Sequence, residues 1–199
     1  MSILGSVLFL FVFWKRLRED YSSEVIFESG SIFLALILLG YFLSLLMKVF
    51  LTESAFFNPE GLWFWGSLAG FYTAFLVSSK KYKLKQVEVL ESGYLALSLW
   101  LLIVYLFNKA VLPLLILLII YLLFFYFQKN YKRFGWYKSG RAGFSGLAAG
   151  GLFFGLRAAL SLLMPETFSF IGKIDFLPSA VATFLFFFSL YNLSEDYVR

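Results

Sequence analysis

The sequence predicts an all-α integral membrane protein, a bundle of about seven transmembrane helices that forms one domain over residues 1–199. Of these residues 61% are hydrophobic and 15% are charged, whereas an average soluble domain has roughly 25% charged residues. Charged residues also divide the chain into apolar runs close to bilayer length, about 17–25 residues. The chain has no Cys and no His. This excludes disulfides, thiolate or imidazole metal sites and Ser-His or Cys-His catalysis, and we expect no metal and no cofactor.

The apolar runs predict spans, in chain order, at residues 2–14, 31–47, 62–79, 92–107, 110–127, 142–164 and 176–193. The first run is short, so it must tilt or let the basic residues that follow it reach the interface. The nearly continuous run 92–127 is divided at Asn108-Lys109, where Pro113 follows closely and a tight outer turn is expected. Polar stretches at 15–30 and 80–91 have loosely helical spacing and predict short amphipathic helices on the inner leaflet.

Small residues mark two spans as central helices of the bundle. The third span carries Gly66, Gly70 and Ala74 at four-residue spacing, and the sixth carries a similar set at Gly146, Gly150, Gly151 and Gly155. Small residues four apart let helix backbones approach closely in lipid. The same space could instead admit a lipid chain or headgroup, and sequence alone leaves both interpretations open. The other spans, rich in Leu, Phe and Ile, should face lipid.

The basic residues predict the orientation. Thirteen fall in the loops after the first, third and fifth spans and in the C-terminal tail, whereas the alternate loops hold only Lys48, Lys109 and Lys173. Basic residues favour the cytoplasmic side of a membrane, so we expect the N-terminus outside and the C-terminus in the cytoplasm. This distribution also explains the net charge of +5 through anionic lipid headgroups, without nucleic acid.

Arg157 is the one basic residue inside a predicted span. A charged side chain there costs about 3 kcal/mol on insertion scales and is a candidate functional residue by default. At 1.5 Å per residue it lies ~22 Å from the inner start of the span, in the outer leaflet. A guanidinium can bind a phosphate through two hydrogen bonds, so Arg157 is a candidate lipid phosphate-binding residue. The alternative is an arginine that reaches the outer interface or bonds helix C-terminal carbonyls.

Three segments resemble one family. Residues 61–97 (GLWFWGSLAGFYTAFLVSSKKYKLKQVEVLESGYLAL), 15–46 (KRLREDYSSEVIFESGSIFLALILLGYFLSLL) and 144–160 (FSGLAAGGLFFGLRAAL) resemble bacterial prolipoprotein diacylglyceryl transferase, as a divergent or degenerate member. The resemblance implies transfer of diacylglyceryl from phosphatidylglycerol to a lipobox cysteine thiol, in lipoprotein biosynthesis on the outer face of the bacterial inner (plasma) membrane. The implied partners are phosphatidylglycerol and a prolipoprotein signal peptide.

The resemblance also assigns outer-face site residues. Arg157 matches the family's arginine in the sixth span, and Gly66 and Gly70 match two glycines of its outer motif. Trp65 stands in place of the motif histidine, and Asn108 is the residue left of a stretch that carries an arginine in the family. The catalytic base is therefore unknown and the active site is eroded. The alternatives are a catalytically inactive relative that binds lipid or protein as a membrane scaffold, and a small substrate-binding subunit of a transporter.

Overall fold

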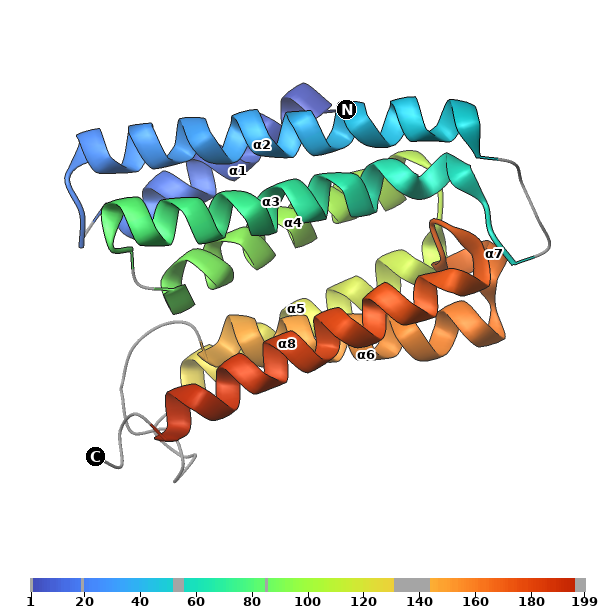
Figure 1. The fold of residues 1–199 in the computed structure, drawn as a ribbon. Helices are drawn as coiled ribbons and strands as arrows, with labels where there is room; N and C mark the ends of the chain where they lie inside the picture. The colour runs from blue at the N-terminus through green and yellow to red at the C-terminus, as the bar shows by residue number, and fades with distance from the viewer. Residues whose placement is uncertain (1, 19, 52–55, 85, 131–143, 196–199) are drawn as a thin grey trace.

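The computed structural model describes residues 2–18, 20–51, 56–84, 86–130 and 144–195, and these residues form helices and no strand. Figure 1 shows the long helices lying alongside one another, with α1 to α4 in one group and α5, α6 and α8 in a second. The long helices are α1 (Ser2–Leu17), α2 (Ser23–Phe50), α3 (Leu62–Tyr82), α4 (Gln86–Phe107), α5 (Val111–Asn130), α6 (Phe144–Leu163) and α8 (Phe176–Glu195). The short ones are η1 (Pro59–Gly61), α7 (Pro165–Phe168) and η3 (Gly172–Asp175).

Five helices of the described chain are long and apolar enough to cross a membrane: α2, α4, α5, α6, and α8 together with η3. Their outer faces carry large apolar side chains, such as Leu46 and Phe50 on α2 and Leu122 on α5, each more than half exposed. The predicted all-α fold is therefore confirmed. The count of seven spans stays a prediction, because α1 and α3 are not among these five helices.

The chain turns where the sequence predicts a turn, but it forms no separate amphipathic helices. Lys109 has a φ of 53° between α4 and α5, so the tight turn is confirmed. The two predicted amphipathic helices are wrong. Residues 15–30 are divided between α1 and α2, because the Ser22 hydroxyl caps α2 by accepting from the Val25 amide and the helix then continues into the apolar run. Residues 80–91 are likewise divided between α3 and α4, at Lys83 with a φ of 52°.

Glycines bring α2 and α3 into close contact. A Cβ added to Gly66 would overlap the carbonyl oxygen of Gly40, and a Cβ added to Gly70 would overlap that of Leu36. The backbones of the two helices therefore touch where the sequence predicts close packing, and only glycine fits. The glycines of α6 also allow close packing, here against side chains. Cβ atoms added to them would overlap Glu91 of α4 and Phe186 and Phe187 of α8.

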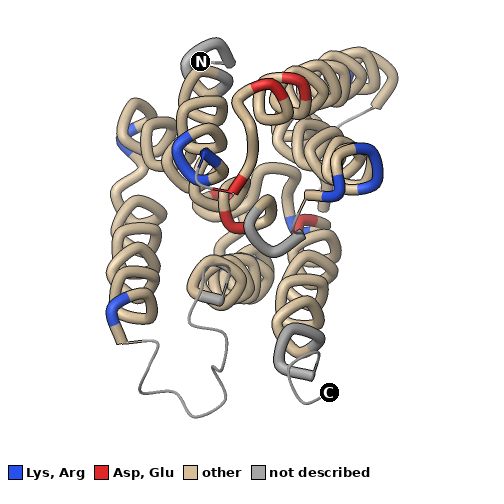
Figure 2. The backbone as a smooth tube through the Cα atoms, turned by 90° about the vertical axis from the view of Figure 1, so that its left-hand side faces the viewer, with Lys and Arg blue, Asp and Glu red and all other residues tan. Residues whose placement is uncertain are grey.

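The two ends of the bundle differ in charge. At the "basic end", where α1, α3 and α5 finish, lie Lys15, Arg16, Arg18, Lys80, Lys81, Lys83 and Lys129. Figure 2 looks onto this end. Here Arg16 pairs with the buried Glu91 at 3.0 Å and joins α1 to α4. Apart from the buried Arg157, the described basic residues of the opposite end are Lys48, Lys109 and Lys173. The predicted basic loop 131–141 lies outside the described residues.

Candidate functional site

Two segments close the end of the bundle opposite the basic end, and we call it the "capped end". Residues 56–61 and the α7–η3 segment (Pro165–Asp175) bond to each other: the Asn58 amide donates to the Ile171 carbonyl at 3.1 Å, and the Ile174 amide donates to the Phe56 carbonyl at 3.2 Å. Gly172 makes this pairing possible. Its φ of 78° is a conformation that glycine adopts readily, and a Cβ added there would overlap the Phe56 carbonyl oxygen. The paired segments bring Phe170 and Asp175 over the end of α6.

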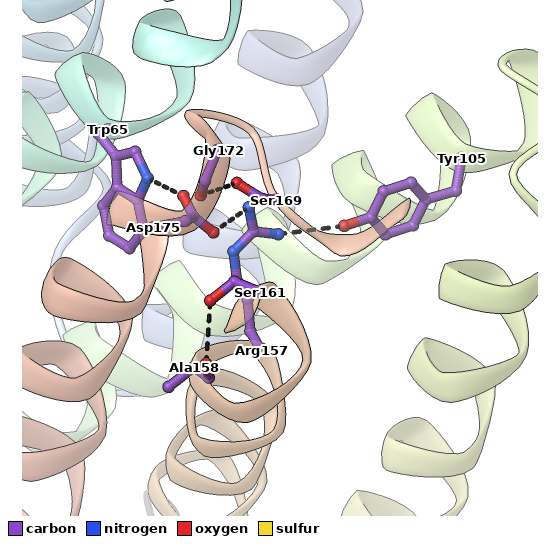
Figure 3. A network of polar contacts seen from close by, with 8 residues as sticks. All are labelled: Trp65, Tyr105, Arg157, Ala158, Ser161, Ser169, Gly172 and Asp175. Atoms are coloured by element: carbon purple, nitrogen blue, oxygen red, sulfur yellow. Dashed lines mark hydrogen bonds and ion pairs between the residues drawn. The ribbon is translucent and has the colours of Figure 1, made fainter. Parts of the chain in front are cut away.

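At the capped end, a buried ion pair joins α6 to η3. Arg157 Nη2 lies 2.7 Å from Asp175 Oδ2, and the two side chains are only 4% and 0% exposed. Trp65 of α3 donates from its indole Nε1 to the other carboxylate oxygen, Oδ1, at 2.5 Å. Arg157 also donates to the Tyr105 hydroxyl of α4 at 3.4 Å. Figure 3 shows Asp175 and Tyr105 pointing toward the guanidinium, and Trp65 pointing toward Asp175.

Aromatic rings enclose the guanidinium. The Arg157 Cζ lies 4.1 Å from the ring centre of Phe170 and 5.0 Å from that of Phe64. These two rings are themselves 4.5 Å apart, and Tyr105 stacks on Phe170 at 6.4 Å. A cation over aromatic faces is stabilised, more strongly so when it is shielded from water. The aromatic rings and Asp175 together explain how a charged side chain is accommodated inside a predicted span.

The guanidinium keeps unused donors. It has five N–H groups, yet among the described residues Nε has no hydrogen-bond partner, and Nη2 meets Asp175 without hydrogen-bond geometry. The bond to Tyr105 is long. One turn beyond Asp175, the Ser179 hydroxyl is also fully buried, with no hydrogen-bond partner in the described part of the chain. Such a site has the donors for a ligand with several acceptor oxygens, such as a phosphate.

An apolar cavity of about 360 Å³ lies beside this site. Residues from Leu90 to Asn108 line it along α4 and the turn that follows, a length of ~27 Å at 1.5 Å per residue. None of the described residues that line it is charged. Phe64 belongs to both features, because it lines the cavity and its ring lies against Arg157. One aromatic ring therefore separates the cavity from the guanidinium.

The structure brings some predicted site residues together and not others. Arg157 is at the centre, and Trp65 contacts it indirectly, through Asp175. Gly66 and Gly70 instead pack against α2, and Asn108 lies exposed at the end of the cavity. Within the described residues no cluster of three or more acidic side chains could hold a metal ion.

Sequence reasoning missed Asp175, Tyr105 and Phe170. Tyr105 and Phe170 carry no sequence signal, because tyrosine and phenylalanine occur throughout this chain, 12 and 27 times. Asp175 did have a sequence signal. It directly precedes the last apolar run, and a carboxylate so close to the membrane interior is costly unless it has a partner.

A scan against protein-family models, a search of curated proteins and a search of solved structures each found no match for this chain.

Proposed function

We propose that this protein lies in the bacterial inner membrane, binds a phosphatidylglycerol-type lipid, and transfers its diacylglyceryl group to a cysteine thiol. The observation that carries the proposal is the position of the long apolar cavity, one aromatic ring from a buried guanidinium. The apolar lining of the first has the chemistry to bind an acyl chain, and the cation of the second has the chemistry to bind a headgroup phosphate. The reaction itself is the one implied by the resemblance to prolipoprotein diacylglyceryl transferase.

The dimensions of the cavity suit an acyl chain. The part of α4 that lines it is ~27 Å long, which is more than the ~15 Å that one acyl chain spans in a leaflet, half of the bilayer's hydrocarbon core. Its volume of about 360 Å³ lies in the range typical of ligand pockets. Its lining is apolar, with isolated polar groups such as Ser67 and Tyr41. A transporter subunit for a polar solute would need a polar pocket, so we set that alternative aside.

The proposed reaction needs a cation for the departing phosphate. A sulfur–carbon bond forms at the glyceryl carbon, the carbon–oxygen bond to phosphate breaks, and its electron pair stays on the phosphate oxygen. The leaving glycerol phosphate gains negative charge, which Arg157 is placed to stabilise from a water-poor site. The thiol proton must also be taken by a base.

The first experiment tests transfer and lipid binding together. Purified protein in liposomes that contain phosphatidylglycerol is given a lipobox peptide, and mass spectrometry measures a diacylglyceryl adduct on its cysteine. Ser67→Phe, which fills the cavity, should abolish both lipid retention and adduct. Ala69→Phe, on the exposed face of the same helix, is the matched control and should retain both. Equal behaviour of the two variants would contradict the lipid site.

A second candidate function is that of a lipid-binding membrane scaffold without catalysis. The observation that favours it is the ion pair itself, because Asp175 already neutralises the charge of Arg157. The same assay separates the two functions. Lipid retained by the wild type without an adduct, while an authentic transferase is active in parallel, would identify the scaffold.

A further inference from the structure

We propose that the inner end of the apolar cavity limits the length of the acyl chain that the protein accepts, and that the ring of Phe71 sets this limit. The inference rests on the proposed function, because it concerns the lipid that the cavity holds. It selects phosphatidylglycerol whose chains fill one leaflet over phosphatidylglycerol with longer chains. Phe71 then determines specificity and takes no part in the reaction.

Side chains from four helices close the cavity toward the basic end. The lining residues nearest to that end, in the order α1 to α4, are Phe9, Leu34, Phe71 and Leu90. The next apolar side chains in that direction do not line the cavity, and Phe13, Phe33 and Val89 among them are only 1%, 0% and 0% exposed. Packed side chains therefore fill the space into which a longer acyl chain would have to extend.

The ring of Phe71 reaches from α3 to α4 at this inner end. A Cβ added to Gly93 of α4 would overlap the tip of the ring, so the ring lies directly against the backbone of α4. The ring centre also lies 5.2 Å from that of Phe33 and 6.2 Å from that of Phe9. An acyl chain therefore cannot extend past Phe71 without displacing a ring that is held on several sides.

The position of this ring matches a chain that fills one leaflet. The Tyr105 hydroxyl accepts from Arg157, and Tyr105 lies ~18 Å from Gly93 along α4 at 1.5 Å per residue. An acyl chain spans ~15 Å in a leaflet, half of the hydrocarbon core. With its phosphate at Arg157, a lipid would place the end of such a chain just before the Phe71 ring, whereas a chain longer by several methylenes would meet the ring.

A longer chain loses by entering this cavity. The bilayer is as apolar as the cavity lining, so the additional methylenes gain nothing from moving into the protein. Inside the cavity they would have to be forced among packed side chains. The protein should therefore discriminate against longer chains by about fivefold or more, which corresponds to about 1 kcal/mol, the low end of the cost of overpacking a core.

Competition between lipids of different chain length tests this limit. Purified protein is equilibrated with vesicles that contain equal amounts of dioleoyl phosphatidylglycerol, dierucoyl phosphatidylglycerol, oleic acid and erucic acid. Mass spectrometry identifies the lipids that co-purify, and lipid that the Ser67→Phe variant also retains is subtracted. We expect dioleoyl phosphatidylglycerol, whose chains fill an ordinary leaflet, to exceed the dierucoyl lipid by about fivefold or more. Retention of both lipids in equal amounts would overturn the proposal, and so would retention of the free acids in their place.

Two substitutions should move the limit in opposite directions. Phe71→Ala removes the ring and leaves an apolar space that a longer chain can fill, so the discrimination against dierucoyl phosphatidylglycerol should disappear. Gly93→Ala adds a Cβ where the tip of the ring lies. Because Phe9 and Phe33 pack against the ring, it must move toward the cavity, and the preference should shift from the dioleoyl lipid to dimyristoleoyl phosphatidylglycerol, which has shorter chains.

The matched controls are Phe124→Ala and Gly155→Ala, which make the same changes away from the cavity. Phe124 is 3% exposed, and a Cβ added to Gly155 would meet Thr183 at an ordinary 3.5 Å; neither residue lines the cavity. Both controls should keep the chain selection of the wild type. A variant that is only less stable would retain less of every lipid at an unchanged ratio, so an unchanged ratio in both Phe71→Ala and Gly93→Ala would contradict the role of Phe71.

The two proposals fail in different ways. A wild type that retains no more phosphatidylglycerol than Ser67→Phe contradicts the proposed function. A wild type that retains phosphatidylglycerol, or transfers its diacylglyceryl group, without selection by chain length contradicts only the limit set by Phe71.

Discussion

At the scale of single residues, Arg157 has a charge that its surroundings must balance. Its guanidinium is 4% exposed, and its nearest counter-charge, Asp175, is fully buried. Breaking a buried pair by removing one partner leaves an uncompensated charge, whereas removing both charges is often close to neutral. The pair should therefore be a strongly coupled unit for stability, separate from any role in lipid binding.

A double-mutant cycle measures this coupling. Arg157→Met should lower the free energy of unfolding by about 3–5 kcal/mol, because Asp175 is left buried without its cation. Adding Asp175→Asn should recover a large part of that loss, since no charge then remains in the pair. Unfolding in detergent micelles gives the values, and Arg18→Met, at the exposed basic end, is the control. Additive effects of the two substitutions would mean that the pair is not coupled.

At the scale of helices, the contact between α2 and α3 depends on glycine. The Cβ of any larger residue at Gly70 would overlap the Leu36 carbonyl oxygen. This oxygen belongs to the backbone of α2, which cannot move aside as a side chain can. Overpacking of an interior commonly costs about 1–3 kcal/mol, and here the two helices must separate. Because α3 carries Phe64 and Trp65, their separation would also displace the candidate site.

Gly70→Leu should therefore destabilise the protein by about 3 kcal/mol or more, at the upper end of the overpacking range. Gly155→Ala is the matched control, because its added Cβ would meet the Thr183 side chain at an ordinary 3.5 Å, and its stability should stay within about 0.5 kcal/mol of the wild type. Thermal unfolding in micelles compares the two. A Gly70→Leu variant as stable as the control would show that α2 and α3 do not pack closely.

How well each feature of this protein can be predicted depends on the kind of signal that it has in the sequence. Hydropathy and glycine spacing are periodic along the chain, so the helices, the turn at Asn108-Lys109 and the close packing at Gly66 and Gly70 could be predicted. Arg157 could be singled out because a charge within an apolar run is rare. Its partner Asp175 could not be identified, because the pairing depends on how the α7–η3 segment folds back over α6, which no local pattern encodes. The amphipathic helices at 15–30 and 80–91 failed because polar spacing does not mark where a helix ends.

At the scale of the whole molecule, the arrangement of charges separates two ends with different properties. The basic end carries seven described basic residues, whereas the capped end holds the site under paired loops. If the basic end faces the cytoplasm, the site lies in the outer leaflet, where a lipidated substrate would be modified. The proposed function requires this orientation, because the acceptor thiol reaches the enzyme from outside.

Because the chain has no cysteine, single cysteines can report the orientation directly. Lys109→Cys lies in the exposed turn at the capped end, and Lys81→Cys lies at the exposed end of α3 on the basic side. In intact spheroplasts, a membrane-impermeant maleimide should label Lys109→Cys within minutes and leave Lys81→Cys unlabelled until the membrane is permeabilised. Wild-type protein, without a thiol, is the background control. The reverse labelling would place the site on the cytoplasmic side, where signal-bearing substrates do not meet it, and would contradict the proposed reaction while leaving the fold intact.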